Sequence, residues 1–297
     1  MVGFVPVALK VAVGSGLMPY LTKRVSRLPA QPRCFVLTYV FCAALVVVMA
    51  IMAGQVALDG TILIIGIFNA IGTYFWWWST DISMSKTALY GLWADMLAMF
   101  LSWLVLNEGH FLNDGILVGL SLSVLSAVLF AYTDYRQSSA DERRAGSSFR
   151  FYLYIGICFT ICGVTMFLTR YWVVQSMPIM TFVVSWYVGC IPGALSVLVM
   201  TTVFGNDRQA SVRRYSIGEL LSILLVAISF IAYTALGFWA YETSQLIVLP
   251  IVMVGDVVVP SLIGLFFFSE RKKLNRVQWA IFALGFVGCC IIATSHW

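Results

Sequence analysis

Long apolar runs alternate with short polar connections along the whole chain. Apolar runs of 18 or more residues recur, and each is close to the ~20 residues that an α-helix needs to cross ~30 Å of hydrocarbon. The pattern predicts an all-α polytopic membrane protein. Its ten transmembrane helices are expected at about residues 3–21, 34–53, 61–79, 88–107, 114–133, 151–174, 178–204, 217–241, 246–268 and 277–295.

Composition supports the membrane assignment and removes other classes. Of the 297 residues, 61% are hydrophobic and only 10% are charged, whereas a soluble domain carries roughly 25% charged residues. A soluble enzyme, a secreted disulfide scaffold and a nucleic-acid binder are therefore excluded, and a lipid bilayer is the expected surrounding. The seven cysteines lie inside apolar runs without a C-x-x-C pair, so they are interpreted as packing residues, and we expect neither a metal site nor a cofactor.

The basic residues predict an orientation. Of the 18 Lys and Arg, 16 lie in the connections that follow the first, third, fifth, seventh and ninth runs. Cytoplasmic loops carry the excess of Lys and Arg, so these connections are expected in the cytoplasm and both termini outside it. The longest of them, residues 134–150, is a polar cytoplasmic linker that divides the chain. We expect a multi-pass protein of a bacterial inner (plasma) membrane, as a monomer or a homodimer.

The two halves, residues 1–133 and 151–297, resemble each other. The sequence GLMPYLTK of residues 16–23 matches GVTMFLTR of residues 163–170, and the spacing E-x-x-x-L-N starts at both Glu108 and Glu270. Matching segments at such spacing predict two five-helix repeats. Because five is odd, the second repeat must be inverted in the membrane, and inverted repeats are typical of secondary transporters.

These segments are similar to the drug/metabolite transporter superfamily, in particular to transporters with two EamA-type five-helix repeats. The likeness lies in the G-x-x-x-x-L-T-[KR] ends of residues 16–23 and 163–170 and in the run 88–108 with its L-x-L-N-E ending, of which FFFSE at 266–270 is the counterpart. The resemblance implies ten helices and metabolite transport, more often export than import. Two features depart from it: similar proteins usually have cytoplasmic termini, and Asp95 stands where a Pro is common.

Three ionisable residues lie well inside the apolar runs: Lys10, Asp95 and Asp256. A central Asp or Lys costs ~2.5–3.5 kcal/mol on membrane-insertion scales, so such residues are functional candidates. The two aspartates are repeat-equivalent, since they are separated by 161 residues. Either they bind a cationic group or carry a proton in a central cavity, or each is a structural residue that is capped or paired with a lysine. Lys10 either takes part in binding or neutralises one of them.

Aromatic residues gather at the ends of two runs and supply further candidates. Trp78 ends the third run and Trp239 the eighth, again at an offset of 161 residues. Aromatic residues in such places form interfacial belts, but they can also line a vestibule and stack on an amine or a ring. Asn69, deeper in the third run, is a buried polar candidate. The proposed substrate- or proton-binding set is therefore Asp95, Asp256, Lys10, Trp78, Trp239 and Asn69.

The function expected from these residues is secondary transport of a small polar metabolite, such as an amino acid or an amine, by alternating access. Proton coupling is one option for the driving force, because a buried carboxylate can take up and release a proton. No Walker motif is present, so ATP does not drive transport in this chain. The alternative is exchange of anionic sugar phosphates or nucleotide sugars, for which Lys10 and Arg170 would supply positive charge.

Other classes fit less well. An intramembrane aspartyl protease also needs two Asp on separate helices, but Asp256 lacks the first Gly of a G-x-G-D motif, and protease chemistry does not require an inverted repeat. A channel or a purely structural protein does not need paired charges at the midplane. We therefore do not expect an enzyme.

Overall fold

The computed structural model describes residues 4–28, 30–109, 113–137, 147–204, 215–243, 245–268 and 276–295, and every regular element in these ranges is a helix. Helices α1 (Phe4–Val11) and α2 (Met18–Ser26) are joined by a π-helical segment, η1 (Ala12–Leu17), into one continuous helix. The others are α3 (Gln31–Met52), α4 (Gly60–Ile82), α5 (Met84–Leu106), α6 (Asp114–Gln137), α8 (Ser147–Val174), α9 (Ile179–Phe204), α10 (Ile217–Ala240), α11 (Gln245–Phe266) and α12 (Arg276–Thr294).

These helices coincide with the ten apolar runs to within a few residues. Eight of them are long and apolar enough to cross a membrane, and α6 and α12 carry the shorter apolar stretches Asp114–Phe130 and Arg276–Gly288. The chain is therefore a multi-pass membrane protein with eight candidate spans. Within the predicted linker 134–150, α6 continues to Gln137 and α8 begins at Ser147; residues 138–146 lie outside the described ranges.

Local sequence explains where several helices begin. The Asp59 side chain accepts hydrogen bonds from the backbone N–H groups of Thr61 and Ile62, which satisfies the free donors at the start of α4. Ser83 separates α4 from α5 and accepts from the Lys86 N–H. At α10 the side chain of Ser216 accepts from the Glu219 N–H while that of Glu219 accepts from the Ser216 N–H, a reciprocal capping box.

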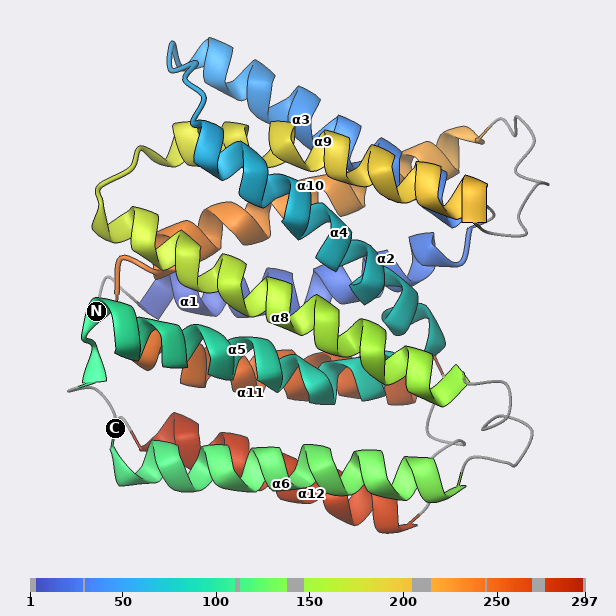
Figure 1. Ribbon diagram of the computed structural model, residues 1–297, viewed down its shortest axis with the longest axis vertical. Coiled ribbons are helices and arrows are strands. Elements are labelled where there is room, and N and C mark those ends of the chain that lie inside the picture. Colours follow the sequence, from blue (N-terminus) through green and yellow to red (C-terminus); the bar gives the residue numbers. More distant parts are fainter. Residues whose placement is uncertain are drawn as a thin grey trace.

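The helices run side by side along a common direction, as Figure 1 shows. Helices α6 and α12 pack closely as a pair at one edge of the bundle, α5 packs on α11, and α4 packs on α9. Successive helices alternate in direction, so the start of α1 and the end of α12 lie at the same end, which we call the chain-end face. The helices α2, α4, α6, α9 and α11 end at the opposite end of the bundle, which is the end that the sequence predicts to be rich in basic residues.

Glycines allow the closest helix contacts. A Cβ atom on Gly66 of α4 would collide with the backbone carbonyl of Trp186, and one on Gly189 of α9 would collide with the carbonyl of Leu63. The two backbones can therefore approach only because these positions have no side chain. In the outer pair, Ser126 of α6 donates to the Ile281 carbonyl of α12 at 2.7 Å.

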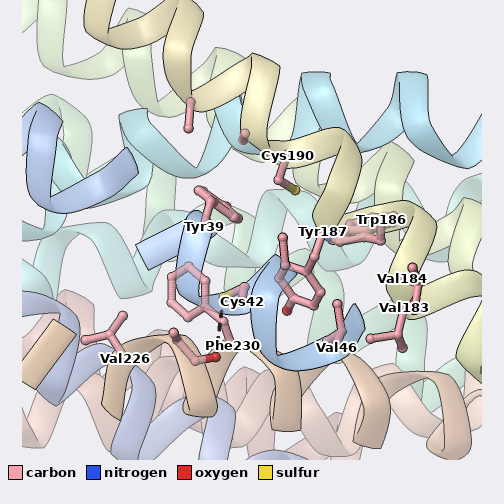
Figure 2. Close-up of a cluster of buried hydrophobic side chains, with 14 of the residues drawn as sticks. Tyr39, Cys42, Val46, Val183, Val184, Trp186, Tyr187, Cys190, Val226 and Phe230 are labelled. Carbon is pink, nitrogen blue, oxygen red and sulfur yellow. Dashed lines mark hydrogen bonds between the residues drawn. The ribbon is translucent and has the colours of Figure 1, made fainter. Parts of the chain in front are cut away.

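The largest hydrophobic cluster lies where α3, α9 and α10 meet. Figure 2 shows Tyr39, Tyr187 and Phe230 at its centre. The ring of Tyr39 is 6.4 Å from that of Tyr187 and 6.1 Å from that of Phe230. This cluster forms one wall of the cavity described next, because the same three side chains also line it.

Candidate functional site: a charged cavity inside the bundle

A cavity of about 200 Å³ lies inside the bundle, between the α1–α2 helix, α3, α4, α5, α8, α9, α10 and α11. Most of its wall is apolar or aromatic. The ionisable side chains of acidic and basic type in its lining are Lys10, Asp95 and Asp256, and Asn69 also lines it. The structure thus brings four of the six residues predicted from the sequence to one cavity.

Lys10 crosses from α1 to the end of α10. Its side chain is 1% exposed, and its Nζ donates a hydrogen bond to the Tyr241 hydroxyl at 2.6 Å. The ammonium also lies 4.1 Å from the ring centre of Tyr241 and 5.3 Å from that of Tyr233, within the range of cation–π attraction. The lysine side chain passes close to Gly237, where a Cβ would stand 3.8 Å from Nζ, an ordinary van der Waals contact.

Asp95 lies near the middle of α5 and is 2% exposed. The predicted small face of this helix is turned inward, because Ala98 and Ser102 are fully buried and Gly91 lines the cavity. Among the described residues, Oδ1 of Asp95 is buried without a hydrogen-bond partner. An unsatisfied buried polar atom is costly, so this oxygen is a natural place for a bound donor.

Asp256 lies in the middle of α11 and accepts a hydrogen bond from the Ser15 hydroxyl at 2.5 Å. Ser15 belongs to the π-helical segment η1, and single π-turns inside α-helices often occur at functional sites. Gly255 allows this approach, because a Cβ there would stand 3.0 Å from the Ser15 Oγ. Pro260, four residues on, has no N–H to offer the Asp256 carbonyl, and it also lines the cavity.

The three charged groups act on one another. Lys10 interacts electrostatically with both carboxylates, and Asp95 with Asp256. Two acidic groups thus share a poorly hydrated space with one basic group. If all three are ionised, the cavity carries one uncompensated negative charge, which favours a cationic guest.

The two predicted tryptophans are not among the residues that line this cavity. The ring of Trp78 packs edge-on against that of Tyr154, with centres 4.9 Å apart, and Trp239 is 41% exposed. Trp76 lines the cavity instead. Two residues that are two positions apart on a helix are rotated by ~200° relative to each other. Trp76 and Trp78 therefore face in nearly opposite directions.

Several lining residues were not singled out from the sequence, although helical spacing marks some of them. Thr73, Trp76 and Thr80 follow the predicted Asn69 at steps of three or four residues on α4, and all four line the cavity. On α10 the spacing Tyr-x-x-x-Gly-x-x-x-Tyr carries the lining residues Tyr233, Gly237 and Tyr241. Such mixed polar and aromatic stripes are the signal that would have identified this wall.

An ion pair lies at the chain-end face, next to the lining residues Thr169 and Tyr241. Nη2 of Arg170 lies 2.8 Å from Oε1 of Glu108, and the two side chains are 13% and 8% exposed. The Nε of Arg170 donates to the same oxygen at 3.1 Å. Its Nη1 donates to the backbone carbonyl of Tyr241 at 2.5 Å and to that of Glu242 at 3.2 Å. One guanidinium therefore joins the ends of α5, α8 and α10.

The part of the chain that the structure describes holds no group of three or more His, Cys, Asp or Glu side chains arranged to bind a metal ion.

Comparison with known proteins adds a fold and no function. No family model matches the chain, and none of the curated proteins matches it. A solved structure, described as "Crystal structure of protein", is similar to it with a TM-score of 0.62 at 16% identity, covering 99% of this chain and 96% of that chain. At this identity the similarity shows the fold alone, and the match over nearly the whole of both chains makes the arrangement of helices a known one.

Proposed function

We propose that this chain is a secondary transporter that moves a small metabolite with a cationic group, such as an amine or an amino acid, by alternating access. One observation carries the proposal: two carboxylates and one lysine, on three different helices, face a single cavity enclosed by spanning helices. Ionisable groups inside membrane-spanning helices are energetically costly. Because these three converge on one cavity, a shared role in binding a substrate explains why they are there.

The helix contacts support the predicted inverted repeat. Helix α8 packs against α4 and α5, and its predicted counterpart, the α1–α2 helix, packs against α10 and α11. Likewise α4 packs against α9 as α10 does against α3, and α5 pairs with α11 as α6 does with α12. Each of these contacts either recurs with the halves exchanged or joins a helix to its own counterpart, as two equivalent repeats of a drug/metabolite-type transporter would require.

The cavity favours a cation over the anionic alternative. Arg170, which would have helped to bind a sugar phosphate or a nucleotide sugar, is held by Glu108 and is not among the lining residues. Lys10 is then the one basic group that faces the cavity among the described residues, and it is outnumbered by two carboxylates. When all three groups are ionised, an anionic substrate meets a net repulsive field.

The protease alternative would need the two aspartates to share a proton across a short distance. Within the described ranges no hydrogen bond joins Asp95 to Asp256, since Asp256 accepts from Ser15 and Oδ1 of Asp95 has no partner. The absence of a shared hydrogen bond among the described residues favours two binding groups over one catalytic dyad.

Uptake by proteoliposomes tests the proposal. The protein is offered amines, amino acids and sugar phosphates, with and without a pH gradient. We expect uptake of a cationic solute, stimulated by the gradient if protons are the coupling ion. Asp95→Asn and Asp256→Asn should each lower the initial rate about tenfold or more, because a contact with a charged group is worth ~1.5–3 kcal/mol.

The matched control is Asp114→Asn, the same substitution at an exposed position at the start of α6, which should leave uptake unchanged. Unchanged uptake in both cavity variants would refute the proposal, and uptake of sugar phosphates alone would favour the anionic alternative.

A further inference from the structure

A second hollow lies on the outside of the bundle, beside the first. This outer groove, of about 270 Å³, is bounded by α5, α6 and α8, and Figure 1 shows α5 between the other two helices. Its floor is buried: Leu89 is fully covered and Leu92 is 3% exposed. Its rim is open, because Trp93 and Val128 are 55% and 59% exposed. The open side belongs to membrane-spanning helices, so it faces lipid.

The outer groove is built for hydrocarbon. Polar side-chain atoms occur in Tyr90, Trp93 and Tyr152, and no lining residue is acidic or basic. The remaining lining residues carry aliphatic or phenyl groups, the thioether of Met96, or no side chain. In a bilayer such a surface has no charged group to attract a polar ligand, and it binds an apolar chain by close packing.

One side chain separates the two hollows. Phe159 of α8 lines both the charged cavity and the outer groove. Its ring lies against Gly91 of α5, where a Cβ would stand 3.8 Å from the nearest ring carbon. Gly91 lines the charged cavity while its neighbour Tyr90 lines the groove. A rotation of the Phe159 side chain therefore changes the boundary between the two hollows without any movement of a helix backbone.

We propose that the outer groove binds the hydrocarbon chain of an amphiphilic amine whose ammonium group lies beside Asp95, and that such a substrate enters sideways from the bilayer past Phe159. The inference rests on the proposed function and specifies its substrate class. Asp95 is one helical turn beyond Gly91 on α5, and both line the charged cavity, whereas Tyr90 and Trp93 of the same helix line the outer groove. The head and the tail of the substrate therefore occupy opposite sides of α5. The hydrocarbon chain of the substrate must therefore extend by about the ~10 Å diameter of a helix to pass from the cavity into the groove.

Transport of two probes with the same head tests the tail site. Tetramethylammonium and decyltrimethylammonium are both permanently charged, so neither crosses as a neutral amine. Gly156 lines the groove, and a Cβ on it would meet no atom within 4 Å, so Gly156→Leu fits the helix and fills the groove. We expect the preference for the long probe over the short one to fall about tenfold, a difference of ~1.4 kcal/mol.

Gly218→Leu is the matched control. It is the same exchange at an exposed position of α10 where a Cβ would also meet no atom within 4 Å, and the preference should remain that of the parent protein. An unchanged preference in Gly156→Leu would refute the tail site.

Photolabelling separates this inference from the proposed function. Decyltrimethylammonium with a diazirine at the end of its chain is bound to the protein in lipid nanodiscs and irradiated. We expect labels on residues 89–96, 124–128 and 152–159, and fewer labels in Asp95→Asn because the head loses its partner. Labels elsewhere would overturn the inference, as would groove labels unaffected by Asp95→Asn, which would indicate a lipid-chain site only. Groove labels that depend on Asp95, in a protein that transports neither these probes nor the amines and amino acids offered above, would refute the transport function and leave the binding site standing.

Discussion

Removing the charge of Glu108 should open the chain-end face of the cavity. In the observed state Arg170 is held by two hydrogen bonds to Oε1 of Glu108 and joins helices α5, α8 and α10. Glu108→Gln keeps the size of the side chain and one acceptor oxygen, but it leaves a buried guanidinium without its counter-charge. The closed arrangement loses stability, whereas an open arrangement, in which Arg170 meets water, is little affected.

The magnitude follows from the burial of the pair. Breaking a buried ion pair by removing one partner costs about 3–5 kcal/mol, and with side chains 13% and 8% exposed little of this is lost to solvent screening. Because the glutamine amide still accepts a hydrogen bond, we take about 2 kcal/mol for Glu108→Gln. At 1.4 kcal/mol for each factor of ten, the population open at this face should rise about thirtyfold.

Cysteine accessibility measures this population. Thr169 lines the cavity next to Arg170 and is 8% exposed, so a Thr169→Cys thiol reacts only when the face opens. A membrane-impermeant maleimide is added to intact cells and, in parallel, to inside-out vesicles, and the labelling of the parent protein with its seven native cysteines is subtracted. The labelling rate should rise by about the same factor as the open population, from one side of the membrane only.

The neighbouring Glu242 provides the control. It contributes its backbone carbonyl to Arg170 while the residue itself is exposed, so Glu242→Gln should label at the parent rate. If Glu108→Gln also labels at the parent rate from both sides, the ion pair does not close this face and the reasoning fails.

Four further predictions address packing, the site and topology. Gly66→Ala should lower the free energy of unfolding by about 1–3 kcal/mol, because its Cβ would strike the α9 backbone, whereas Gly60→Ala, which faces open space, should not; thermal melts in detergent compare the two. Ser15→Ala should raise the KM for the transported cation, because the Asp256 carboxylate loses the hydroxyl that fixes its position in the cavity, and an unchanged KM would count against Ser15 as part of the site. Tyr241→Phe should also increase the chain-end labelling of Thr169→Cys, since it frees Lys10 from the end of α10. A C-terminal reporter that is active only outside the cytoplasm should be active, and activity of a cytoplasm-only reporter would reverse the predicted orientation.

Much of the fold could be predicted because hydrocarbon imposes a simple rule. Each span must be a helix of about twenty apolar residues, so run lengths alone located the helices. The π-helical segment η1 could not be predicted, because it depends on partners distant in sequence. Gly14 lies so close to Tyr233 of α10 that a Cβ would collide with its ring, and Gly255 of α11 lies similarly close to Val11.

The charged residues of the site could be predicted for a related reason. Lys10, Asp95 and Asp256 stand out because an ionisable group in an apolar run must find a protein environment, and all three line the cavity. Trp78 and Trp239 illustrate the limit of this reasoning. An aromatic side chain is compatible with lipid, with the membrane interface and with a cavity. The residue type therefore does not reveal which of these environments the side chain faces.

Tyr241 links the charged cavity to its closed end. Its hydroxyl accepts the hydrogen bond from Lys10 at 2.6 Å, and its backbone carbonyl accepts the one from Arg170 at 2.5 Å. The residue follows the last turn of α10, so a displacement of that turn changes both contacts together. If the cavity binds a cation as proposed, that cation competes with Lys10 for the negative charge of Asp95 and Asp256. The proposed transport mechanism then predicts that the position of Lys10, and through Tyr241 that of Arg170, depends on whether the cavity is filled, as alternating access requires of a binding site and its gate.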